Sequence, residues 1–142
     1  MPLRLLVLYG AIGGLASVLA AALMRSLLAA AKPSAPEAVP PPPLLPTWKD
    51  VIEAGTHVLA GAGIGLLFWL SWGFAAIVTV PWWVRGVAFG GGCALTLAVP
   101  ALVGAALRTG VRPGQAMALL LEWSYTCVMA ALACAWIAEV VQ

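Results

Sequence analysis

Apolar residues fill four long blocks of this chain, and polar residues lie between the blocks or near their ends. We expect helices at about 4–25, 51–78, 84–107 and 115–138. Each block is long enough for the roughly 20 helical residues that cross the hydrocarbon core of a bilayer. The pattern therefore predicts an all-α integral membrane four-helix bundle, built as two transmembrane hairpins within a single membrane domain.

The composition agrees with a membrane protein. Of the 142 residues, 63% are hydrophobic and 8% are charged, against about 25% charged residues in soluble domains. This excludes a water-soluble fold, and the short connections leave no room for a nucleic-acid module. The three cysteines lie inside apolar blocks without a CxxC arrangement, so we expect buried thiols and no cofactor.

Prolines predict a connector and a kink. The connector, residues 32–49, is rich in proline, which favours an extended segment at the membrane surface. Thr47 is placed to cap the next helix, with Asp50 in the first turn, where the helix dipole favours an acid. Pro100 interrupts the third block and predicts a kink, because proline has no N–H to donate to the carbonyl of Thr96.

The basic residues predict the orientation. Those that border the connections after the first and third blocks are Arg25, Lys32, Lys49, Arg108 and Arg112, whereas Arg4 and Arg85 lie on the other side. The positive-inside rule then places both termini on the non-cytoplasmic side of a bacterial inner membrane. Near that outer interface we expect Arg85 and Glu139 to reach water separately rather than to pair.

Glycines recur at four-residue spacing on three of the blocks, as Gly10 and Gly14, Gly61 and Gly65, and Gly86 and Gly90. Such seams let helix backbones approach closely. Three seams exceed what a four-helix bundle must bury. We therefore expect one of them to meet another membrane subunit or a second copy of the chain.

Two ionisable residues lie inside the predicted spans. Glu122 stands about nine residues into the fourth span, where a charged carboxylate costs several kcal/mol. His57 stands about seven residues into the second, and both spans start from the same side, so the two depths agree to roughly 3 Å. We predict that His57 and Glu122 pair, with Glu53, Tyr125 and Thr126 as supporting polar residues.

This pair permits two kinds of function. A carboxyl group facing an imidazole can relay protons in a transporter, or it can fix helix order through hydrogen bonds alone. Asp50, Glu53 and His57 have a spacing that suits a divalent metal on one side of a helix. Acids are also ordinary at a helix start, however, and we predict no metal.

The leading functional hypothesis is a non-enzymatic accessory or assembly subunit that packs through its glycine seams. Packing and topology explain nearly all of its residues, and no catalytic constellation is present. The alternative is an oligomeric channel or proton-coupled transporter of a small solute that uses Glu122 and His57. The expected partners are the lipid bilayer and other membrane subunits or copies of the chain, and no nucleic acid.

Overall fold

The computed structural model describes residues 2–31, 47–75, 79–109 and 113–141, and the regular elements in these ranges are all helices. They are α1 (Leu3–Ala31), α2 (Trp48–Ala75), α3 (Trp82–Cys93), the π-helical segment η1 (Ala94–Ala98), α4 (Val99–Thr109) and α5 (Pro113–Val140). α3, η1 and α4 follow one another without a break. These ranges thus hold four helices long and apolar enough to cross a membrane, and the predicted fold class is confirmed.

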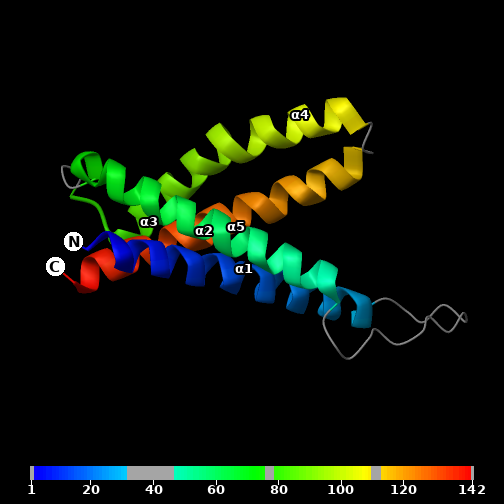
Figure 1. Cartoon of the computed structure of the whole chain (residues 1–142), viewed down its shortest axis with the longest axis horizontal. Coiled ribbons are helices and arrows are strands. Elements are labelled where there is room, and N and C mark those ends of the chain that lie inside the picture. Colours follow the sequence, from blue (N-terminus) through cyan, green and yellow to red (C-terminus); the bar gives the residue numbers. More distant parts are fainter. Residues whose placement is uncertain (1, 32–46, 76–78, 110–112, 142) are drawn as a thin grey trace, which may run out of the picture.

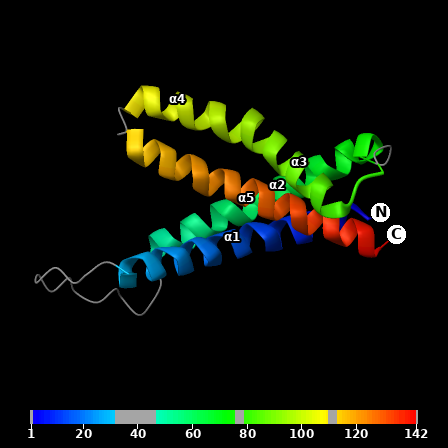
Figure 2. The ribbon, with the colours of Figure 1, turned by 180° about the vertical axis from the view of Figure 1, so that it is seen from behind.

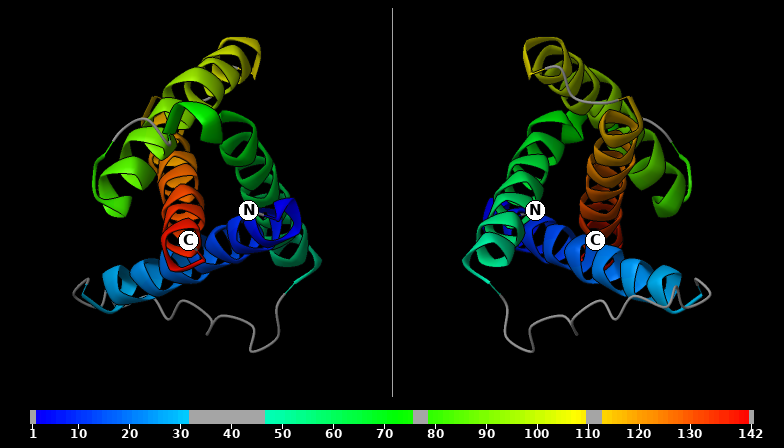
Figure 3. Two further views of the ribbon diagram at one scale, coloured as in Figure 1. Left: turned by 90° about the vertical axis from the view of Figure 1, so that its left-hand side faces the viewer. Right: turned by 90° about the vertical axis from the view of Figure 1, so that its right-hand side faces the viewer.

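The two hairpins lie together near the chain termini and diverge toward the opposite end (Figure 1). The view from behind shows the same divergence (Figure 2). α5 contacts α1, α2 and α3, and the end-on views place it between α2 and α3 (Figure 3). Both termini lie at one end, as four crossings require, while the side of the membrane that they face stays a prediction.

One of the two buried clusters of the apolar core lies near the termini. Leu6 of α1, Phe68 of α2 and Cys134 and Ala138 of α5 are almost fully buried there. Phe89 of α3 meets Phe68 edge to face, with ring centroids 5.1 Å apart. All three cysteines are buried free thiols, as the apolar blocks predict. The polar pair of the second and fourth spans lies farther from the termini than this core.

Glycines bring α1 and α2 into backbone contact. A Cβ atom built on Gly10 would lie 2.2 Å from the carbonyl oxygen of Gly61. One built on Gly14 would lie 2.2 Å from the carbonyl oxygen of His57. Any larger residue would push the helices apart. The backbone of His57 is therefore held against α1 while its side chain extends to α5.

All three predicted glycine seams are occupied within the chain. Gly65 meets the backbone of Leu6 on α1, and on α3 Gly86 and Gly90 meet the α5 backbone at Leu132 and Val128. The excess of seams that motivated association with another chain is therefore not found. Association itself stays a prediction and needs a different argument.

The start of α2 has the cap that Thr47 and Asp50 predict, and the helix changes its hydrogen-bond pattern in the third span next to Pro100. The backbone N–H and the hydroxyl of Thr47 donate to Asp50 Oδ2 at 2.6 and 2.7 Å. In η1, the N–H of Val99 donates five residues back to Ala94, a wider turn placed directly before Pro100. The connector at 32–46, the turn at 110–112 and the end of the second predicted span at 76–78 lie outside the described residues.

Candidate functional site

His57 of α2 and Glu122 of α5 face each other inside the membrane spans. His57 follows Trp48, the first residue of α2, by nine residues, and Glu122 follows Pro113, the first of α5, by nine residues. At 1.5 Å per residue, each lies roughly 14 Å along its helix. His57 Nε2 and Glu122 Oε1 are 3.7 Å apart. The structure thus brings together the two residues that the sequence places at one depth.

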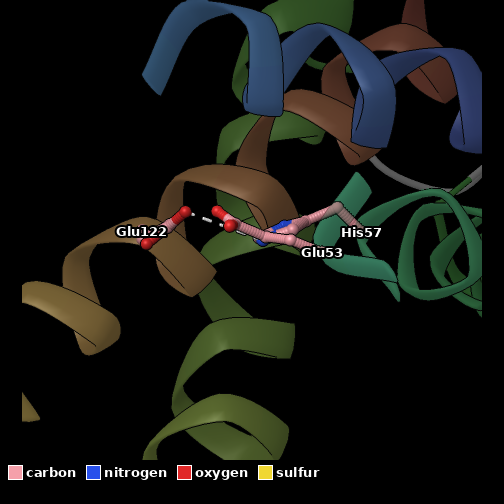
Figure 4. Close-up of side chains that lie close together, drawn as sticks. All are labelled: Glu53, His57 and Glu122. Atoms are coloured by element: carbon pink, nitrogen blue, oxygen red, sulfur yellow. Dashed lines mark ion pairs between the residues drawn. The ribbon is translucent and has the colours of Figure 1, made fainter. Parts of the chain in front are cut away.

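Glu53 brings a second carboxylate to this pair. One ligand atom from each of Glu53, His57 and Glu122 lies within 4.8 Å of the other two, and the three side chains converge from α2 and α5 (Figure 4). They line a pocket of about 170 Å³ together with Thr56, Leu119 and Trp123. Two carboxylates and one imidazole therefore share a small pocket between two helices.

Hydrogen bonds on the far side of the imidazole fix its orientation. His57 Nδ1 lies 2.8 Å from Thr126 Oγ1, which lies 2.9 Å from Ser17 Oγ. Ser17 donates to the carbonyl of Gly14 at 2.7 Å. His57, Thr126 and Ser17 are each at most 3% exposed. One buried network therefore joins α1, α2 and α5 behind the pocket.

The short contacts of this network favour one assignment of the imidazole proton. A carbonyl oxygen can only accept, so the Ser17 hydroxyl proton goes to Gly14. Thr126 then donates to Ser17, and its oxygen accepts from Nδ1–H of His57. This assignment satisfies the three shortest contacts and leaves out the longer one, 3.1 Å from Thr126 to the carbonyl of Glu122. In the neutral ring, the Nε2 lone pair then faces the pocket.

Trp123 forms one wall of the pocket. Its indole stacks on the His57 imidazole, with ring centroids 4.5 Å apart and 16° between the planes. The face of a tryptophan ring attracts cations, so a cation that enters the pocket meets a favourable wall. Trp123 also lines an apolar groove, and it therefore borders both the polar pocket and this groove.

Glu122 Oε1 is a buried polar atom without a hydrogen bond. It has no hydrogen-bond partner among the described residues, and its 3.7 Å approach to His57 Nε2 exceeds hydrogen-bond distance. A buried acceptor left unpaired costs about 1–3 kcal/mol, and more when it is charged. Such an atom calls for a specific explanation, and a bound ion is one of the recognised ones.

The other residues predicted for the site divide into two groups. Thr126 belongs to the network, whereas Tyr125 is 43% exposed and lines no part of the pocket. Asp50 bonds to Thr47 at the start of α2. The two acids beside His57 are therefore Glu53 of α2 and Glu122 of α5, and not Asp50 and Glu53 of α2.

Sequence reasoning missed Ser17 and Trp123. Ser17 stands three residues after Gly14, and the close approach of Gly14 to α2 could have placed it near His57. Trp123 is marked in the sequence only by its position next to Glu122, because the direction in which it points depends on how α5 is rotated.

Arg85 and Glu139 form a separate ion pair between α3 and α5. Arg85 Nη2 donates to Glu139 Oε2, and the glutamate side chain is half exposed. The expectation that each would reach water separately is therefore wrong. Gly86 and Gly90 let α3 approach the backbone of α5 closely, and this close approach brings the side chains of Arg85 and Glu139 within reach of each other.

Comparison with protein-family models, curated proteins and solved structures gave no match. The side chains of the pocket and the packing around them are therefore the ground for a functional conclusion.

Proposed function

We propose that this small polytopic membrane protein is a non-enzymatic channel or proton-coupled transporter of a small solute, in which His57 and Glu122 exchange the proton. The observation that carries the proposal is the 3.7 Å approach of His57 Nε2 to Glu122 Oε1 within the membrane spans. Ionisable residues at such depth are costly and usually mark ion or proton pathways. The Ser17 and Thr126 hydroxyls alone would be enough to order the helices.

Both protonation states suit the pocket. A proton on Nε2 gives an imidazolium that is attracted to the two carboxylates and to the face of Trp123. The donor at Nδ1 is already satisfied by Thr126. Glu122 Oε1 needs to move by less than about 1 Å to accept a hydrogen bond from Nε2. A proton can therefore pass between the two groups with little rearrangement.

Proton flux in liposomes tests this function. The full chain is reconstituted with an internal pH dye, and a membrane potential is imposed. We expect acidification with the wild type, its loss in Glu122→Gln, and its retention in Glu139→Gln, which removes a carboxylate from the same helix outside the pocket. Flux that is equal in the wild type, Glu122→Gln and empty liposomes would count against the proposal.

A second candidate function, an accessory or assembly subunit, is supported by a separate observation. An apolar groove of about 620 Å³ lies between α2, η1, α4 and α5, and Gly63, Ala98 and Ala101 are among the residues that line it. No atom of the described residues lies within 4 Å of a Cβ built on Gly63. Small residues at an open groove allow a helix of another subunit to pack closely.

Native mass spectrometry after mild extraction tests the accessory role. Gly63→Leu places a bulky side chain at a position where a Cβ meets no described atom within 4 Å. A defined companion that is lost in this variant, together with absent proton flux, would favour the accessory role. Monomer alone at high concentration would count against it.

A further inference from the structure

We propose that Glu53, His57 and Glu122 bind one divalent first-row transition-metal cation, such as Zn²⁺ or Mn²⁺, within the membrane spans. This inference rests on the proposed function for its biological meaning, since it names a divalent cation as the solute of the same pocket. It departs from the expectation, from sequence, of no metal at these residues. The three ligands come from two helices, an arrangement that the spacing on α2 alone does not predict.

The distances suit a shared ion. Two ligand atoms that each lie about 2.1 Å from one metal ion are at most about 4.2 Å apart. His57 Nε2 and Glu122 Oε1, 3.7 Å apart, meet this limit, with an angle at the metal of about 120°. One oxygen of Glu53 lies within 4.8 Å of a ligand atom on each of the other two residues, so a side-chain rotation of Glu53 can complete the set.

The imidazole is already oriented as a ligand. A histidine that binds metal through one nitrogen almost always donates its other N–H to a fixed acceptor. His57 Nδ1 lies 2.8 Å from Thr126 Oγ1, and the tautomer assigned above, in which Nδ1–H donates to Thr126, turns the Nε2 lone pair toward the pocket. Thr126 therefore acts as a positioning residue, held in turn by Ser17.

The charge of the pocket matches a divalent ion. Two ionised carboxylates carry two negative charges, and one divalent cation neutralises them within the membrane, where net charge is costly. The pocket's lining residues, as far as the structure describes them, include no lysine or arginine.

The ligand types select the class of metal. Imidazole suits transition metals such as Zn²⁺ and Fe²⁺, whereas Mg²⁺ and Ca²⁺ prefer oxygen ligands alone. Glu122 Oε1 is buried without a hydrogen-bond partner, and a bound ion would give this oxygen a coordination bond. The pocket of about 170 Å³ leaves room for water to complete the coordination.

Metal titration of the full chain tests the inference. The tag is removed, because tags bind metals, and the detergent-solubilised protein is stripped with a chelator and titrated with Co²⁺. We expect one equivalent per chain with visible ligand-field absorption, displaced by Zn²⁺ but not by Mg²⁺. Glu53→Gln and Glu122→Gln should abolish binding, Thr126→Val should weaken it by about 10–100-fold, and Glu139→Gln should leave it unchanged.

The wild type alone provides a second measurement, in case a variant fails to fold. X-ray absorption at the zinc edge should show nitrogen and oxygen ligands without sulfur. Sulfur ligation, no Co²⁺ binding, or equal binding by the wild type and Glu122→Gln would overturn the inference. Proton flux without metal binding would overturn it and leave the proposed function standing. Metal binding without proton flux would do the reverse.

Discussion

His57 Nδ1 lies 2.8 Å from Thr126 Oγ1, and this contact connects the pocket to the hydroxyl of Ser17 on α1. The imidazole is thereby oriented by side chains from two other helices. Because one ring nitrogen is committed to this network, the other faces Glu122. The packing of three helices therefore controls the chemistry that the pocket can perform.

Thr126→Val should destabilise the protein by about 1–3 kcal/mol, because it leaves buried hydrogen-bonding groups of His57 and Ser17 without a partner. Equilibrium unfolding in mixed detergent micelles measures the loss. Thr96→Val is the matched control, since its exposed hydroxyl bonds only to Gly92 of its own helix, and it should change stability by less than about 0.5 kcal/mol. Equal losses in the two variants would contradict the structural role of the network.

Gly61→Ala should cost about 1–3 kcal/mol through overpacking, because its Cβ would lie 2.2 Å from the carbonyl oxygen of Gly10. Gly63→Ala on the same helix meets nothing within 4 Å and should be neutral or stabilising by up to about 1 kcal/mol. Thermal unfolding of both variants in one detergent gives the comparison. If Gly61→Ala is tolerated as well as Gly63→Ala, α1 and α2 do not meet as described.

The spans, the glycine contacts and the depth of the polar pair follow from local sequence. Four apolar blocks predict four crossings, and the spacing of Gly10 and Gly14 predicts a surface where another backbone can approach. Counting residues along two spans places His57 and Glu122 at one level. These properties depend on length and position along a helix, which the sequence determines directly.

The local sequence does not determine how each helix is rotated about its axis. Apolar residues surround α5 on all sides, so no apolar stripe shows which side faces its neighbours. The depth of Glu122 is therefore predictable, but its approach to Glu53 and the stacking of Trp123 depend on packing between helices. The ion pair between Arg85 and Glu139 depends on that packing too.

The pair of Arg85 and Glu139 should contribute at most about 1 kcal/mol, because the glutamate is half exposed and exposed ion pairs are weak. A double-mutant cycle with Arg85→Gln and Glu139→Gln, measured by unfolding at low and high salt, gives the coupling energy. We expect a small coupling that falls with salt. A coupling above about 2 kcal/mol, insensitive to salt, would show a pair shielded from solvent.

Acid should weaken metal binding in the pocket. The groups that bind the cation are Glu53 and His57 on α2 and Glu122 on α5, while the described part of α1 contributes only the uncharged Ser17 beside this network. Protons compete with the cation for the same three groups, so the apparent affinity should fall as the pH is lowered, and binding should release protons. Co²⁺ titrations at several pH values, with proton release followed in weak buffer, measure both effects. An affinity that does not change with pH would mean that the cation binds elsewhere, because these ligands bind metal only when deprotonated.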